Sequence, residues 1–152
     1  MNIIETPDMW VLRIGRRLTI PAIRQAATEC APVIDGAIRD FGLAVAGPWT
    51  FIAHGLPKDG KTPFDWQICR PVVRPEGYEG PVELAHIEPA IVASRVHQGS
   101  LRTLFTQGYA PLVAEIEMSR HTFSGQSREV YHDWNGPGAP YHRIEIQFEL
   151  AR

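Results

Sequence analysis

The sequence lacks several features that would place it in a common class of protein. It has no hydrophobic run long enough to span a bilayer, and its amino terminus, MNIIETPDMW, lacks the basic and apolar segments of a signal peptide. Its 15 Lys and Arg residues are outnumbered by 17 Asp and Glu residues, so no excess of positive charge predicts nucleic-acid binding. We therefore expect a cytoplasmic protein that does not itself bind nucleic acid or a membrane.

Motifs for the common catalytic and metal-binding chemistries are also absent. The two cysteines, Cys30 and Cys69, form no C-x-x-C motif and no cluster with histidine. The histidines lack the H-E-x-x-H spacing of zinc enzymes, and neither a G-x-S-x-G motif nor a phosphate-binding loop is present. We expect two reduced, buried cysteines, no metal and no cofactor.

The patterns that are present predict one domain with alternating strands and helices. The 152 residues, 44% of them hydrophobic, are enough to form a single core. Apolar alternation predicts strands, and apolar residues three and four positions apart predict helices. Strands are expected at Trp10–Ile14, Trp49–His54, Phe64–Val72, Ala90–Val96, Arg128–His132 and Tyr141–Leu150, and helices at about 20–41 and 101–116.

These elements follow the order strand, helix, strand, strand twice, which predicts an internal duplication. The helix sequence APVI at Ala31–Ile34 recurs as APLV at Ala110–Val113. Each helix thus has a proline, Pro32 or Pro111, at a similar interior position, where it is expected to kink or break the helix. The stretch Arg74–Pro89, which contains Pro and Gly, is predicted to link halves of about 8–73 and 82–151 within one domain, 1–152.

The apolar stripes of the helices determine the expected architecture. The first stripe includes Cys30 and Ile34, and the second includes Leu101, Phe105, Leu112 and Ile116. A helix of about fifteen residues cannot bury such a stripe by itself. We therefore predict an α+β fold of two βαββ modules, with both main helices on one face of an antiparallel sheet and a ligand groove between the halves.

The segment Arg128–His132, REVYH, contains the most informative carboxylate. Strand periodicity places Glu129 and Tyr131 on one side and Val130 on the other. Two interpretations of Glu129 remain open from the residues alone. It is either an exposed glutamate paired with Arg128 or Arg143, or a carboxylate in a cavity, where it would take up a proton or pair with a cation.

The order and spacing of several segments resemble the GyrI-like small-molecule-binding family, also known as the AraC/BmrR-type effector-binding domain. The resemblance covers roughly Trp10 to Leu150. It is carried by FDWQICRPV, ASRVHQGSLRTLFTQGYAPLVAEI, SREVYH and the terminal YHRIEIQFEL. It implies modules related by a pseudo-twofold axis and an aromatic cavity between them that holds lipophilic, often cationic, molecules. It also implies that Glu129 lies in that cavity.

Aromatic residues on the predicted strands and helices are the candidate walls of this cavity. Tyr131 shares the face of Glu129, while Trp49 and Phe51 share a face of the corresponding strand in the first half. Trp66 and Tyr109 complete the set of predicted ligand-binding residues.

Three functions are compatible with this interpretation. The first is a stand-alone sensor or sequestering protein for a lipophilic, possibly cationic, small molecule. The second is a hydrolase of reactive electrophiles that uses Glu129 as base or nucleophile, with Tyr131 as helper, as the resemblance implies for a subset of the family. The third is a protein-interaction module, of the kind that gave the family its gyrase-related name. A protein partner or a homodimer is possible in each case.

Overall fold

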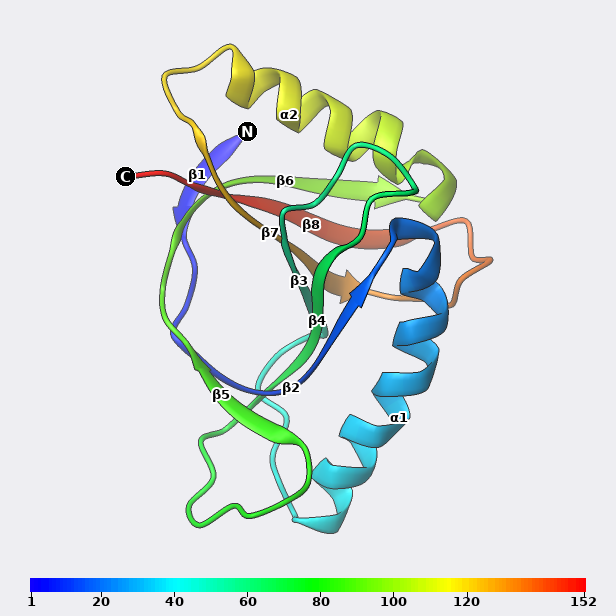
Figure 1. The fold of residues 1–152 in the computed structure, drawn as a ribbon, viewed down its shortest axis with the longest axis vertical. Coiled ribbons are helices and arrows are strands. Elements are labelled where there is room, and N and C mark those ends of the chain that lie inside the picture. The colour runs from blue at the N-terminus through cyan, green and yellow to red at the C-terminus, as the bar shows by residue number, and fades with distance from the viewer.

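A computed structural model describes residues 1–152 and shows one antiparallel sheet of eight strands, in the order β1-β6-β8-β7-β3-β4-β2-β5 (Figure 1). The predicted α+β class is therefore confirmed. The strands are β1 (Asn2–Glu5), β2 (Met9–Leu18), β3 (Thr50–His54), β4 (Phe64–Val72), β5 (Glu83–Ile87), β6 (Ile91–Gly99), β7 (Phe123–Asp133) and β8 (His142–Leu150). The helical segments are η1 (Ile20–Ala22), α1 (Ile23–Asp40), η2 (Leu101–Thr103), η3 (Leu104–Tyr109) and α2 (Ala110–Glu117).

The two outer strands were not expected from the sequence. β1 lies before the first predicted strand, and β5 lies inside Arg74–Pro89, so that segment is not simply a linker. β1 pairs with β6, and β5 pairs with β2. Each of these short strands therefore lies beside a strand from the other half of the chain. A short edge strand has a neighbour on one side only, so its sequence shows a weaker apolar pattern than a central strand.

Both main helices pack on one face of the sheet, as predicted (Figure 1). α1 buries Cys30 and Ile34 against β2, β3 and β4, where Leu12, Ala53, Trp66 and Ile68 belong to the same core cluster. α2 buries Leu112 and Ile116 against Ala93 of β6 and Ile146 of β8. The two helical stripes therefore form two core clusters, one in each half of the sheet.

The two prolines do not occupy equivalent positions. α1 continues through Pro32, whereas Pro111 lies in the first turn of α2 and follows the π-helical segment η3. Pro111 has no N–H group to donate to the carbonyl oxygen of Gln107, which instead accepts a hydrogen bond from Nε of Arg95 at 3.2 Å. The wider π turn also changes the helical phase, so Phe105 is 65% exposed rather than on the buried face of Leu112.

The opposite face of the sheet has its own small apolar cluster and is partly covered by connecting segments. Val11, Ile52, Cys69 and Ala85 form the cluster. The β1–β2 and β5–β6 connections run along this side (Figure 1) and are joined by hydrogen bonds from Thr6 N to Ala90 O, 2.8 Å, and from Ala90 N to Thr6 Oγ1, 2.9 Å. Neither main helix has the length and apolar content needed to cross a membrane.

Candidate functional site

The site is built on β7, whose alternating side chains point to the two faces of the sheet. Glu129 and Tyr131 lie on the helix-covered face, where Phe51 of the neighbouring β3 is directly opposite Glu129. Arg128 and Val130 lie on the other face. The sheet register thus places Glu129 in the central pair of strands, between the core clusters of α1 and α2.

Two tyrosine hydroxyls donate hydrogen bonds to the Glu129 carboxylate. Tyr131 Oη donates to Oε1 at 2.5 Å, and Tyr109 Oη donates to Oε2. Burial raises the pKa of both tyrosines well above the usual value, and the nearby Glu129 charge raises each pKa further. Both phenols therefore remain protonated donors at any physiological pH.

Glu129 has no ion-pair partner within the described residues. Arg143 pairs with Asp133 at 2.9 Å, and Arg128 extends to Thr6 on the far face of the sheet. The interpretation of Glu129 as an exposed residue paired with Arg128 or Arg143 is therefore wrong. The carboxylate is held by neutral donors alone.

Aromatic rings surround this carboxylate. The ring of Phe51 is 4.7 Å from that of Tyr131 and 5.1 Å from that of Trp66, measured between ring centroids. Tyr109 makes an edge contact with Phe148 at 5.9 Å. Trp66 lines the cavity, and its indole Nε1 is buried without a hydrogen-bond partner.

The cavity beside Glu129 is smaller than the predicted groove. Its volume is about 20 Å³, which is room for about one water molecule. Tyr109 reaches in from η3 and occupies the space between the halves, a contact that local sequence patterns do not specify. The cavity is lined by Ile23, Phe51, Ala53, Leu56, Phe64, Trp66, Tyr109, Ser127, Glu129 and Arg128, although the guanidinium of Arg128 extends to Thr6 on the other face.

Five of the six predicted site residues come together, and one does not. Glu129, Phe51, Trp66 and Tyr109 line the cavity, and Tyr131 joins them through its hydrogen bond. Trp49 instead packs with the α1 core, under the guanidinium of Arg70 at 4.8 Å.

Trp134, in the loop after β7, stacks on His142 at 4.5 Å and meets the edge of Tyr131 at 5.6 Å. Phe148 lies within the predicted strand Tyr141–Leu150 but is not among the predicted site residues. Its contact with Tyr109 depends on the position of η3, which strand periodicity does not determine.

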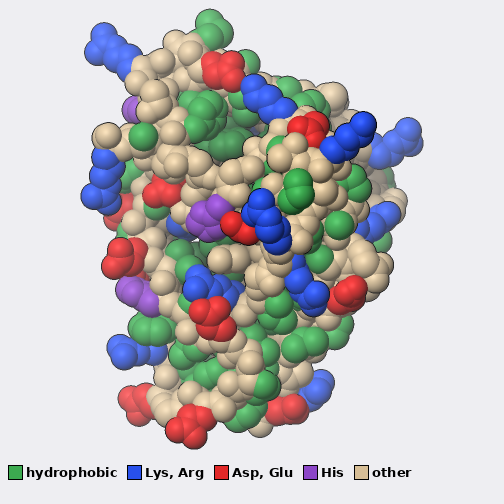
Figure 2. Space-filling model, viewed as in Figure 1, with side chains coloured by type: hydrophobic (Ala, Val, Ile, Leu, Met, Phe, Trp, Pro, Cys, Tyr) green, Lys and Arg blue, Asp and Glu red, His purple; other side chains and the backbone are tan.

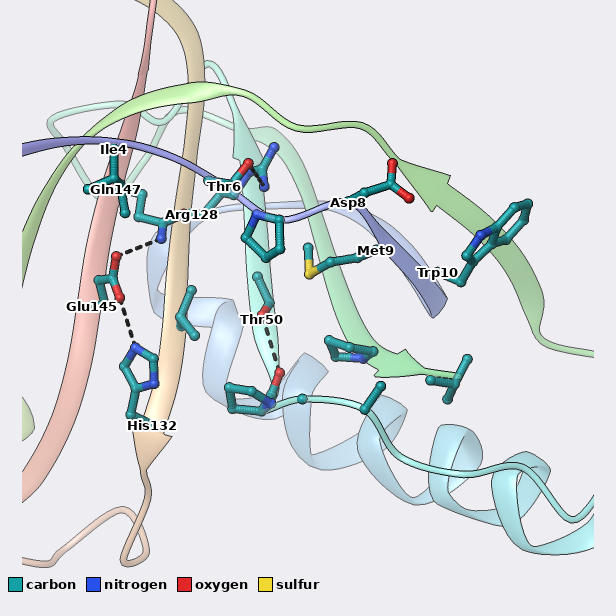
Figure 3. A pocket seen from close by; sticks show the side chains of 17 residues that line it. Ile4, Thr6, Asp8, Met9, Trp10, Thr50, Arg128, His132, Glu145 and Gln147 are labelled. Atoms are coloured by element: carbon teal, nitrogen blue, oxygen red, sulfur yellow. Dashed lines mark hydrogen bonds and ion pairs between the residues drawn. The ribbon is translucent and has the colours of Figure 1, made fainter. Parts of the chain in front are cut away.

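A second and larger cavity, of about 410 Å³, lies on the opposite face of the sheet (Figure 3), and no sequence pattern indicated it. Arg128, Val130, His132 and Glu145 belong to its walls. No group of three or more His, Cys, Asp and Glu side chains is arranged to hold a metal ion. On the molecular face seen in Figure 2, Lys and Arg side chains are interspersed with Asp and Glu.

Comparison with solved structures identifies this fold in other proteins. The C-terminal domain of EcmrR superposes with a TM-score of 0.80 at 19% identity, over 99% of this chain and 96% of that chain. In the complex of EcmrR with DNA, the match spans 57% of the EcmrR chain, with a TM-score of 0.78. SAV2435 bound to tetraphenylphosphonium matches with a TM-score of 0.68 at 12% identity, over 99% of this chain and 93% of that chain.

A hydrolase encoded by lin2189 from Listeria innocua also matches, with a TM-score of 0.63 at 12% identity, over 99% of this chain and 91% of that chain. No family model and no curated protein sequence matches the chain. At these identities the likeness extends to the fold. The chain therefore has the fold of the EcmrR C-terminal domain, which is consistent with the GyrI-like effector-binding domain that its sequence resembles.

Proposed function

We propose that this protein binds a lipophilic organic cation at Glu129, as a sensor or a sequestering protein. One observation carries the proposal: Glu129 is a partly buried carboxylate among aromatic rings, with two neutral hydroxyl donors and no cation beside it. A carboxylate in such surroundings is stabilised by a positive charge that enters with its own apolar surface. Aromatic faces add cation–π attraction.

The cation would occupy space that Tyr109 now fills, because a cavity of about 20 Å³ holds no organic ligand. Tyr109 ends η3, a π-helical segment preceded by the short 3₁₀ turn η2. Such turns have poorer hydrogen-bond geometry than an α-helix and are found at hinges and functional sites. Leu112 and Ile116, the buried residues of α2, lie outside this segment. Tetraphenylphosphonium, which is bound by SAV2435, has the proposed chemistry of an apolar cation.

The test is a titration with tetraphenylphosphonium, followed by calorimetry and by quenching of tryptophan fluorescence. We expect saturable binding by the native protein and a dissociation constant at least about 30-fold larger for Glu129→Gln, since a buried charge pair is worth about 2–5 kcal/mol when one partner is removed. Glu145→Gln is the matched control, because Glu145 is also partly buried but lies on the other face of the sheet. Equal affinity of the native protein and Glu129→Gln would refute the electrostatic anchor.

A hydrolase is the second candidate, and a different observation favours it. Glu129 lies beside a cavity with room for about one water molecule, and two phenol groups contact the carboxylate. If Tyr109 is displaced to admit a strained electrophile, Glu129 could take a proton from the water that attacks it, and a freed tyrosine hydroxyl could donate to the oxygen released. The hydrolase from Listeria innocua has the same fold.

Incubation with styrene oxide, followed by chromatography of the diol, tests this alternative. Turnover above the background rate that disappears in Glu129→Gln would favour hydrolysis. Binding of tetraphenylphosphonium together with no turnover of styrene oxide would favour the sensor or sequestering function.

A further inference from the structure

The larger cavity on the face opposite Glu129 has the dimensions of a ligand site. Its volume of about 410 Å³ lies within the range of small-molecule pockets, roughly 300–1,000 Å³. The strands β7 and β8 line one side of it, and the β1–β2 connection crosses over another (Figure 3). Met9, Trp10, Pro48 and Val130 supply apolar surface.

Arg128 is the unusual residue of this cavity. Its side chain is almost completely buried, with 4% exposure, although it has five N–H donors. Nη1 donates to Thr6 Oγ1 at 3.3 Å, Nε is buried without a partner, and no carboxylate lies within ion-pair distance. Burial lowers the pKa of Arg128, an effect that the more distant Glu149 opposes. A buried guanidinium with unused donors is stabilised by an anion.

The carboxylates of the same cavity are already engaged. Glu145 accepts hydrogen bonds from Ser94 Oγ at 2.7 Å and Gln147 Nε2 at 2.7 Å, and its Oε1 lies 2.8 Å from His132 Nε2. Figure 3 shows His132, Glu145 and Gln147 joined along one wall, with Arg128 and Thr6 joined at another. Asp8 lies 2.6 Å from His86 Nε2. These negative charges disfavour a polyanion such as a nucleotide, whereas one carboxylate placed at Arg128 avoids them.

We propose that this cavity binds a small apolar monocarboxylate. The ligand carboxylate accepts hydrogen bonds from the unused Arg128 donors, and its apolar body lies against Met9, Trp10 and Val130. Arg128 and Glu129 are consecutive residues of β7 that face opposite sides of the sheet. The two sites are therefore back to back, and this proposal does not depend on the function proposed for Glu129.

The probe is 3-phenylpropionate, and its neutral amide, 3-phenylpropionamide, is the control. Calorimetry is expected to show saturable binding of the acid and at least tenfold weaker binding of the amide, because a hydrogen bond between two charged groups is stronger than one to a neutral acceptor. In NMR spectra of the native protein, the Nε–Hε resonance of Arg128 should shift when the acid is added and should not shift when the amide is added. This measurement requires no variant.

Two variants locate the binding site independently. Arg128→Met removes the charge, and replacing a buried charge by an apolar side chain is often neutral for folding. Val130→Trp fills the cavity from the side formed by β7 and leaves Arg128 in place. Each should weaken binding of the acid at least tenfold, while Glu129→Gln should leave it unchanged. The proposal is overturned if the acid does not bind, if it binds without moving the Arg128 resonance, or if Glu129→Gln weakens binding and Arg128→Met does not.

Discussion

Substitution of Tyr109 by phenylalanine tests the central hydrogen bond of the Glu129 site. The change removes one hydroxyl and preserves the ring and its edge contact with Phe148. Hydrogen bonds to charged groups contribute about 1.5–3 kcal/mol, and Glu129 would retain only the donor Tyr131. We therefore expect the free energy of unfolding to fall by about 1.5–3 kcal/mol, which for a domain of this size lowers Tm by roughly 3–12 °C.

The matched control is Tyr78→Phe. Tyr78 Oη donates to the neutral backbone carbonyl of Val82 at 2.8 Å, so its loss should cost only about 0.5–1.5 kcal/mol. Urea denaturation at pH 7 gives both values, and calorimetry gives the Tm of each variant. A double-mutant cycle that combines Tyr109→Phe with Glu129→Gln isolates the interaction between the two side chains. The loss of unfolding free energy caused by Tyr109→Phe should be smaller when the acceptor at position 129 is neutral. If Tyr109→Phe costs no more than Tyr78→Phe, the charged hydrogen bond does not exist.

Three further predictions follow from other contacts. Gly108→Ala should lower the free energy of unfolding, measured by urea denaturation, by about 1–3 kcal/mol, because the added Cβ would lie 2.7 Å from Ile146 Cδ1 in the core. An unchanged urea midpoint would contradict this packing. Burial alone would raise the pKa of Glu145, but hydrogen bonds from Gln147, Ser94 and His132 outweigh it and lower that pKa below the ordinary 4.5. Because the pKa of Glu145 is depressed in the folded state, its stabilisation is present above about pH 4.5 and is lost as pH falls through the folded pKa. The free energy of unfolding of Glu145→Gln should therefore fall less steeply at acid pH than that of the native protein. An equally steep fall in the two proteins would refute this expectation. Burial raises the pKa of the Cys69 thiol to about 12, and Cys30 is equally buried. A thiol reagent at pH 8 should therefore modify neither cysteine until urea unfolds the protein. Rapid labelling of the native protein would contradict this burial.

Local periodicity was sufficient to predict much of the framework. The alternation of β7 placed Glu129 and Tyr131 on one side, and they do share a carboxylate–phenol hydrogen bond. The apolar spacing of the second helix predicted that Leu112 and Ile116 are buried together. These predictions succeed because a strand repeats every two residues and a helix about every 3.6, so sequence neighbours determine which side chains share a face.

Several features depended on segments that are distant in the sequence. The pairing of β1 with β6 and of β5 with β2 is set by long-range register, and short edge strands have little apolar pattern of their own. The exposure of Phe105 follows from the π turn of η3. Apolar spacing predicts a regular α-helix over Leu104–Tyr109, because it gives no sign of a π turn that rotates the side chains out of register.

The sequence by itself determined the α+β class, the two helical stripes and the shared face of Glu129 and Tyr131. Only the tertiary structure decided that Tyr109 reaches Glu129, that Trp49 packs elsewhere under Arg70, and that Arg128 is buried on the far side of the sheet. The physical reason is that periodicity specifies the direction of a side chain within its own element. Which partner it meets depends on how the elements pack, and therefore on contacts between residues far apart in the chain.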